Sequence, residues 1–431
     1  MQNKCDRACK GRNFLGQRSY MNRRNFLQGL ALAGAASLVK SPDDLNAQSR
    51  AAESKLKIVS VDTYPVKLWE RSDQGTLPEF TSDYDPKRWR YTGPFAQLAG
   101  AIVVVIKTNT GITGFGMGGG GKVGCEIIQG HLRHLLIGTN PLNIELLWDQ
   151  MYTSSNFYGR RGVFVMALSG VDNALWDLFG KQADQPVYRL LGGTTKERIP
   201  IYHTGVPAAV QTGLDLNIRH FKVVIWDGLA EGEEGKRRTV KTLQEFREKV
   251  GVDRTIMIEC VAGWDDVDYT IDMANRLKDL NLYWIEEPLS PDNILGYGRL
   301  VKEIDSTRIA NGEHEYTRFG FAELIRHNAA DVLQPDVTWC GGVTSLRKIS
   351  AMAAAHGLEF TPHRGGSLYG LPLCLSSSQC NWAESFGTTD SGTELMNAMS
   401  ATFENGYYLP SEKPGFGTSL TEDLVKEYSI S

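Results

Sequence analysis

The feature that most constrains the fold of this chain is a repeated alternation of short apolar segments with longer helical segments. Strands are predicted at 198–202, 221–226, 255–259, 282–286, 308–311, 331–334 and 359–361. Helical runs are predicted between them, such as 240–250, 267–279 and 344–356. Consecutive strands joined by crossover helices must lie parallel to one another. Seven or eight such units predict an α/β fold with a TIM-type barrel over residues 195–390, whose reactive groups lie at the carboxyl ends of the strands.

An α+β module is predicted ahead of the barrel, over residues 55–190. Its expected elements are strands at 55–68, 101–107 and 111–116 and helices at 124–137, 142–153 and 163–181. The second and third strands form a hairpin around Asn109-Thr110-Gly111. The tail, 391–431, contains Gly and Pro residues typical of turns, and we expect it to pack back on this module.

The first 47 residues are typical of an export signal. Arg23-Arg24 with Phe26-Leu27 precedes an apolar stretch, 29–39, that is too short to span a bilayer as a helix. The paired arginines resemble a twin-arginine signal, which predicts export to the periplasm. The alternative is an amphipathic surface helix, but residues 30–39 offer no polar face.

Charge and cysteine usage exclude several classes of partner. The chain has a formal net charge of −4, and cleavage after Ala47 would remove eight basic and three acidic residues and leave −9. Nucleic acid would favour a basic face, so we expect no nucleic-acid partner, and no membrane partner once the signal is removed. The seven cysteines are scattered and include no CxxC pair, which argues against a disulfide framework or a zinc knuckle.

Three carboxylates end three successive predicted strands of the barrel. Glu259, Glu286 and Glu313 follow one another at intervals of 27 residues, one strand–helix unit each. At the mouths of adjacent parallel strands they would converge, and like charges gathered in this way resist ionising unless a cation lies among them. Oxygen ligands at a small site favour Mg²⁺. A single such Glu would more often be a solvated loop residue, whereas three in phase with the repeat predict a metal site.

The next two strands continue the pattern with an acid and a histidine. Asp336 follows the strand at 331–334, and His363 follows the next strand, again 27 residues later. Neighbouring strand ends could bring Asp336 within hydrogen-bond reach of His363, which would fix its tautomer and raise its basicity. The other interpretation of a lone histidine is a structural residue, and we apply it to His131, His134, His327 and His356, which lie in predicted helices.

Several segments resemble the mandelate racemase branch of the enolase superfamily. They are Ser169-Gly-Val-Asp-Asn-Ala-Leu-Trp-Asp177, Pro186-Val-Tyr-Arg-Leu-Leu-Gly-Gly193, Trp284-Ile-Glu-Glu-Pro288, and Pro335-Asp336 with Gly341-Gly342. Within that branch the chain is most similar to L-rhamnonate dehydratases and related acid-sugar dehydratases. The specific segments are Asn311-Gly-Glu-His-Glu315, Gln334-Pro-Asp-Val-Thr-Trp-Cys-Gly-Gly342, Pro362-His363 and Pro414-Gly-Phe-Gly417.

The resemblance implies a (β/α)₇β barrel with an N-terminal α+β capping domain that the C-terminal tail completes. It implies Mg²⁺ on Glu259, Glu286 and Glu313, with His363 and Asp336 as the base and later the acid. It further implies that Glu384 hydrogen-bonds the substrate carboxylate, that His314 touches sugar hydroxyls, and that Lys222 holds the substrate carboxylate. A surface position at a strand end is the alternative interpretation of Lys222. Relatives often form homo-oligomers, so we expect one here.

Two departures from the branch bear on function. Most relatives carry Asp where this chain has Glu259, which is one methylene longer. Racemases of the branch carry Lys-x-Lys on the second strand, whereas this chain has Lys222-Val223-Val224. Acid–base chemistry on one face disfavours racemisation and favours dehydration.

These features predict Mg²⁺-dependent dehydration of an acid sugar to a 2-keto-3-deoxy acid. The base would remove the α-proton, and the metal would stabilise the resulting enediolate. One alternative is an epimerase, racemase or lactone-forming cycloisomerase that uses the same intermediate. Another is an exported, non-catalytic sugar-acid-binding protein, for which Glu259 is the main support.

Overall fold

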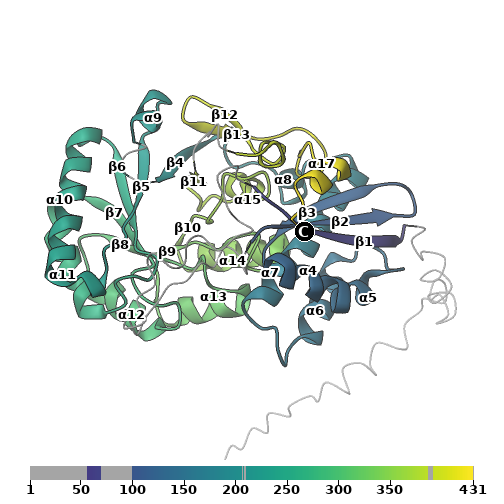
Figure 1. The fold of residues 1–431 in the computed structure, drawn as a ribbon, viewed down its shortest axis with the longest axis horizontal. Helices are drawn as coiled ribbons and strands as arrows, with labels where there is room; N and C mark the ends of the chain where they lie inside the picture. The colour runs from purple at the N-terminus through teal and green to yellow at the C-terminus, as the bar shows by residue number, and fades with distance from the viewer. Residues whose placement is uncertain (1–55, 69–99, 206, 208–209, 387–391, 431) are drawn as a thin grey trace, which may run out of the picture. The chain divides into compact units, whose positions relative to one another are not determined.

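The computed structural model describes residues 56–68, 100–205, 207, 210–386 and 392–430 of the chain (Figure 1). The predicted export signal lies outside the described residues, and twin-arginine export stays a prediction. The described part of the chain, from Leu56 onward, forms one compact unit.

Eight parallel strands of the described residues form the barrel wall (Figure 1). They are β4 Ile199–Gly205, β5 His220–Val224, β6 Thr255–Glu259, β7 Leu282–Glu286, β8 Arg308–Asn311, β9 Val332–Leu333, β10 Glu359–Phe360 and β11 Ala383–Ser385. Their order across the sheet is β10-β9-β8-β7-β6-β5-β4-β11. Seven helices connect them: α9 Val210–Asp215, α10 Gly232–Val250, α11 Val267–Leu277, α12 Ile294–Glu303, α13 Thr317–Arg326, α14 Gly342–Ala355 and α15 Leu371–Ser376. The predicted (β/α)₇β barrel is confirmed.

Helix α11 illustrates how the sequence builds the outer layer. It begins after Asp266, whose side chain accepts a hydrogen bond from the backbone N–H of Tyr269. Tyr269, Met273 and Leu277 follow at helical spacing and are buried against the sheet. The local sequence thus determines both the start of the helix and its buried face.

A separate apolar cluster fills the barrel interior. Its buried members are Tyr202, Met257, Trp284, Ala310 and Val332, from five different strands. The rings of Tyr202 and Trp284 meet edge to face with centroids 5.4 Å apart. The barrel is therefore a packed core, and polar chemistry is confined to the carboxyl ends of its strands.

The capping module contains an antiparallel sheet with helices packed on it (Figure 1). The strands are β1 Ile58–Pro65, β2 Ile102–Thr108 and β3 Thr113–Gly118. The helices are α4 Gly121–Ile127, α5 Arg133–Leu136, α6 Ile144–Ser154, α7 Val163–Ala183 and α8 Val187–Leu190, with a π-helical turn, η2 Ile128–Leu132, between α4 and α5. The single helix predicted at 124–137 is therefore a composite. Helix α7 is long and apolar enough to cross a membrane, but 89% of its apolar window is buried, as in a core helix.

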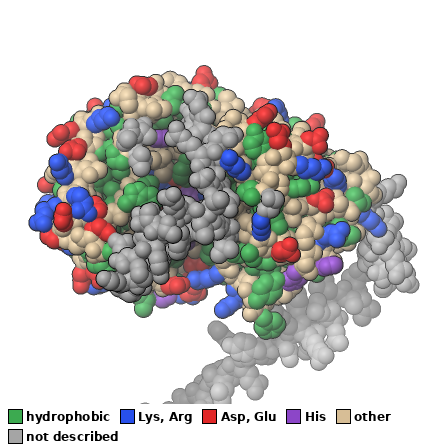
Figure 2. All heavy atoms as spheres, in the orientation of Figure 1, with side chains coloured by type: hydrophobic (Ala, Val, Ile, Leu, Met, Phe, Trp, Pro, Cys, Tyr) green, Lys and Arg blue, Asp and Glu red, His purple; other side chains and the backbone are tan. Residues whose placement is uncertain are grey.

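The C-terminal tail contacts both the capping module and the barrel. It contains α16 Glu394–Asn397, β12 Thr402–Glu404, β13 Tyr407–Leu409 and α17 Glu422–Glu427. Strand β13 pairs antiparallel with β4, a contact that the sequence pattern does not predict. Bridges Val66–Ser429 and Pro186–Gly415 lie between the tail and the capping module. On the face drawn in Figure 2, acidic and basic side chains are interspersed rather than gathered by sign.

Side chains of α7 cap the amino end of the barrel helix α14. Ser169 Oγ accepts from the N–H of Gly341, Asn173 Oδ1 from Val343 and Asp172 Oδ2 from Thr344. These N–H groups have no partner within their own helix. The segment 169–177, which carries much of the family resemblance, therefore joins the capping module to the barrel.

We expect Asn173→Ala to lower the free energy of unfolding by about 3 kcal/mol. The Asn173 amide also donates to Met117 O at 2.9 Å and Val337 O at 3.2 Å, so its loss removes three hydrogen bonds to buried backbone groups. Denaturant unfolding measures the change. Asn156→Ala, at an exposed position, is the control and should change stability by less than about 0.5 kcal/mol. An unchanged midpoint for Asn173→Ala would contradict this role.

Candidate active site

The carboxyl ends of the barrel strands bring all eight predicted site residues to one region. Glu259 and Glu286 end β6 and β7, Lys222 lies in β5, and Glu384 lies in β11. The remaining four, Glu313, His314, Asp336 and His363, lie just after β8, β9 and β10. The strand–helix repeat predicted five of them at this edge, and the family resemblance implied Lys222, His314 and Glu384.

The three predicted metal ligands converge. One carboxylate oxygen from each of Glu259, Glu286 and Glu313 lies within 4.8 Å of the other two. Glu259 and Glu286 are directly paired across the parallel strands β6 and β7, which places their side chains on the same face. The convergence expected from the spacing of 27 residues is present in the structure.

Local donors orient two of these carboxylates. The backbone N–H of Val261 donates to Glu259 Oε1 at 2.7 Å, from a residue with φ of +48°. The indole Nε1 of Trp284 donates to Glu286 Oε2 at 2.9 Å. Glu259 Oε1 is thus held by the backbone just beyond its own strand, which uses part of the extra length of Glu over Asp.

The electrostatics of the cluster suit a cation. Burial, together with the charge of Glu286, raises the pKa of Glu259 well above its ordinary value. Burial likewise raises the pKa of Glu313 to about 6, although the nearby His363 and His314 oppose the rise. A divalent cation among these oxygens would reverse both shifts by favouring the ionised forms. The donor set, three carboxylates and no sulfur, fits Mg²⁺.

Lys222 is buried inside the carboxylate cluster. Its Nζ lies 2.6 Å from Glu286 Oε1, 2.9 Å from Glu384 Oε1 and 3.5 Å from Glu259 Oε2, and its side chain is 2% exposed. Burial alone would lower the pKa of Lys222, but the charges of Glu286 and Glu384 outweigh it and raise the pKa well above the ordinary value. The alternative of a surface lysine is therefore wrong. Contact with a substrate carboxylate stays a prediction.

His363 and Asp336 form the predicted pair. His363 Nδ1 lies 2.8 Å from Asp336 Oδ2, and both side chains are buried. Asp336 Oδ1 accepts from the N–H and the Oγ1 of Thr338, which fixes the carboxylate. If Nδ1 donates to Asp336, His363 Nε2 is left as the acceptor, and it faces Glu313 at 3.7 Å and Glu384 at 3.8 Å. Burial opposes protonation of His363, but the charges of Glu313 and Glu384 and the bond to Asp336 raise its pKa.

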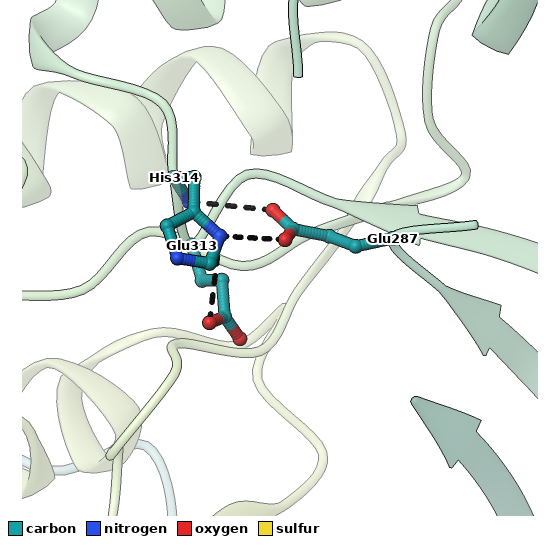
Figure 3. Close-up of side chains that lie close together, drawn as sticks. All are labelled: Glu287, Glu313 and His314. Atoms are coloured by element: carbon teal, nitrogen blue, oxygen red, sulfur yellow. Dashed lines mark hydrogen bonds and ion pairs between the residues drawn. The ribbon is translucent and has the colours of Figure 1, made fainter. Parts of the chain in front are cut away.

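His314 is held by Glu287, a residue that the sequence analysis did not single out (Figure 3). His314 Nδ1 lies 2.6 Å from Glu287 Oε2 and 3.6 Å from Glu313 Oε1. Burial opposes protonation, yet the charges of Glu287 and Glu313 raise the pKa of His314 to about 10. The pairing with Glu287 therefore favours the protonated form of His314, and its contact with sugar hydroxyls stays a prediction.

Glu384 is an ionised acceptor. Its Oε1 accepts from Thr204 Oγ1 at 2.6 Å and pairs with Lys222, and its Oε2 accepts from the N–H of Arg364 at 2.8 Å. Burial would raise the pKa of Glu384, but the charges of Lys222 and His363 outweigh it and lower the pKa to about 2. An ionised carboxylate only accepts hydrogen bonds, so the predicted bond to a substrate carboxylate requires a proton on one of the two groups.

Sequence reasoning missed four residues at the site: Thr204, Glu287, Trp339 and Arg364. The indole of Trp339 lies between the rings of His314 and His363, with centroids at 5.5 and 5.4 Å. Glu287 could have been found, because it directly follows a predicted ligand. Arg364 likewise directly follows the predicted base His363, whereas Trp339 carries no comparable signal, since its loop has no regular period.

Comparison with known families identifies both parts of the chain. Residues 93–192 match the mandelate racemase / muconate lactonizing enzyme N-terminal domain. Residues 206–424 match the enolase C-terminal domain-like family. These two matches cover most of the capping module and of the barrel, and strands β1 and β4 lie outside them.

Individual relatives agree with these matches. The L-rhamnonate dehydratase of Saccharopolyspora erythraea is 36% identical over 335 residues, 76% of this chain and 85% of the relative. The rhamnonate dehydratase of Gibberella zeae, crystallised with Mg, superposes with a TM-score of 0.78 at 31% identity, covering 88% of this chain and 98% of that one. The 3,6-anhydro-D-galactonate cycloisomerase of Zobellia galactanivorans superposes with a TM-score of 0.73 at 25% identity. The superposition covers 87% of this chain and 100% of the cycloisomerase.

Proposed function

The chain belongs to the mandelate racemase / muconate lactonizing enzyme family of the enolase superfamily, and we propose that it is a Mg²⁺-dependent hydro-lyase acting on an acid sugar. The product would be a 2-keto-3-deoxy acid. The observation that carries the proposal is the juxtaposition of three convergent carboxylates with a buried histidine–aspartate pair. Relatives named L-rhamnonate dehydratase support the choice of reaction and of substrate class.

Glu259, Glu286 and Glu313 would hold the ion. Bound Mg²⁺ would supply positive charge opposite the substrate carboxylate, which makes the adjacent α-proton more acidic. The cationic Lys222 and His314 add positive charge at the same edge of the barrel. A protein with a net negative charge can in this way bind an anionic substrate.

His363 would transfer the proton. Its Nε2 removes the proton from C2, while Asp336 at 2.8 Å stabilises the imidazolium that forms. The imidazolium then returns this proton to the hydroxyl leaving C3, so that water departs and a C2–C3 enol remains. Tautomerisation of the enol gives the 2-keto acid. One substrate molecule thus yields one product and one water.

The arrangement of bases favours dehydration over epimerisation. Epimerisation requires a second base on the opposite face of C2. Lys222, on β5, is paired with Glu286 and Glu384, and Val224, two residues later on the same strand, has no ionisable group. Two histidine–carboxylate pairs lie among the described residues at these strand ends, His363–Asp336 and His314–Glu287. We assign proton transfer to His363, because its Nε2 faces the carboxylates of Glu313 and Glu384.

We expect the purified chain with Mg²⁺ to convert at least one six-carbon aldonate to a 2-keto acid, which a semicarbazide assay of an aldonate panel detects. Removal of the metal with EDTA should abolish the activity, and added Mg²⁺ should restore it. In D₂O, loss of the C3 hydroxyl should accompany any exchange at C2. Exchange at C2 without water loss would favour an isomerase, and no 2-keto acid from a broad panel would contradict the proposal.

A further inference from the structure

Arg364 directly follows His363 and adopts a backbone conformation that L residues rarely use. Its φ is +55°, and two glycines, Gly365 and Gly366, come next in the sequence. The conformation directs its N–H toward Glu384 Oε2 at 2.8 Å. Glycine would make the same backbone bond without strain. The bond to Glu384 therefore does not explain why an arginine side chain stands at this position.

The Arg364 side chain lies beyond the imidazole of His363 as seen from the carboxylate cluster. His363 Nε2 faces Glu313, whereas its Nδ1 faces Asp336, and the Arg364 Nε lies 3.8 Å from Asp336 Oδ2. The guanidinium stacks on Trp339 at 4.8 Å from the ring centroid. The same indole borders His363.

The donors of this guanidinium are available. At 3.8 Å the contact with Asp336 is too long for a hydrogen bond, and no residue that the structure describes accepts one from the guanidinium. Asp336 already accepts bonds from His363 and Thr338, so it does not depend on Arg364 for its orientation. The Arg364 side chain is 33% exposed, which leaves its planar set of N–H donors accessible to a ligand.

We propose that Arg364 binds oxygen atoms of the substrate beyond C3 and thereby contributes to substrate choice. The assignment rests on the proposed function. A sugar acid with its carboxylate at the ion held by Glu259, Glu286 and Glu313 and with its C2 at His363 Nε2 would have C4 to C6 directed away from the ion. Among the described residues near His363, Arg364 is a cationic group whose donors no described residue accepts. Hydroxyl or carboxylate oxygens at C4 to C6 match its donors.

The test compares six-carbon and three-carbon acids. Calorimetry with Mg²⁺ present measures the Kd of L-rhamnonate, D-gluconate and both glycerate enantiomers on the His363→Asn chain, which binds without consuming them. Glycerate keeps the carboxylate and the C2 and C3 oxygens but has no further carbons. Adding Arg364→Met to the His363→Asn chain should raise the Kd of whichever six-carbon acid binds that chain more tightly by about 10- to 100-fold. Binding of glycerate should change by less than about threefold.

A matched control is Arg308→Met. Arg308 also stacks on an aromatic ring, Tyr283 at 4.3 Å, but it starts β8 at the opposite end of the barrel, so its loss should leave both affinities unchanged. If the Met variant folds poorly, the same measurement is made on Arg364→Gly, because glycine adopts φ of +55° without strain. Equal weakening of both acid lengths, or no weakening of either, would overturn the assignment of Arg364 alone. Failure of every acid to bind in the presence of Mg²⁺ would overturn the proposed function as well.

Discussion

Replacing His363 by Asn is expected to lower kcat for dehydration by about 10⁴-fold, because one imidazole both removes the α-proton and returns it to the leaving hydroxyl. An asparagine amide can still donate to Asp336, whose Oδ2 lies 2.8 Å from His363 Nδ1 in the wild-type chain. The pocket therefore keeps its shape and loses only the proton-transferring group. Steady-state kinetics on the acid found in the panel measures the loss.

Binding separates this role from a structural one. The Kd of the same acid should change by less than about threefold in His363→Asn, since no ligand to the metal is removed. His356→Asn is the matched control, because His356 is exposed at the end of α14 and should leave kcat unchanged. Activity within tenfold of the wild type in His363→Asn would remove His363 from the mechanism.

The sequence was most informative where chemistry follows the strand–helix repeat. Glu259, Glu286 and Glu313 recur every 27 residues, and equal spacing along a βα repeat becomes adjacency around a barrel. The same rule brought Asp336 next to His363. The proximity of these residues depends only on where the strands end, so it could be predicted from the sequence without knowing how the side chains pack.

Features that depend on packing or on long-range contacts were not predictable from the repeat. Strand β13, for example, joins the sheet through a long-range contact with β4. The burial of Lys222 among three carboxylates depends on which face of β5 points inward and on what the neighbouring strands present there. The positive φ of Arg364 follows from the loop that surrounds it, for which the sequence carries no periodic signal.

Replacing Lys222 by Met is expected to lower the free energy of unfolding by about 3–5 kcal/mol without added metal. The substitution removes a buried cation and leaves Glu286, Glu384 and Glu259 without their shared partner. Lys222 also opposes the rise in the pKa of Glu259, so the rise should be larger in the variant. A carboxyl group with a raised pKa stabilises the folded chain when protonated and loses that contribution as pH rises. The free energy of unfolding of the variant should therefore be lower at pH 8 than at pH 6.

Metal addition then tests the carboxylate cluster itself. Mg²⁺ should raise the Tm of Lys222→Met by more than it raises that of the wild-type chain, because the cation replaces the lost ammonium charge among the same oxygens. Lys241→Met is the matched control, since that lysine is 77% exposed on α10 and should change neither the stability nor the response to metal. No rise in Tm with Mg²⁺ in either chain would contradict a metal site at Glu259, Glu286 and Glu313, and equal rises would contradict the exchange of the lysine charge for the ion. A Lys222→Met chain as stable as the wild type without metal would instead show that the buried carboxylates are neutral when folded.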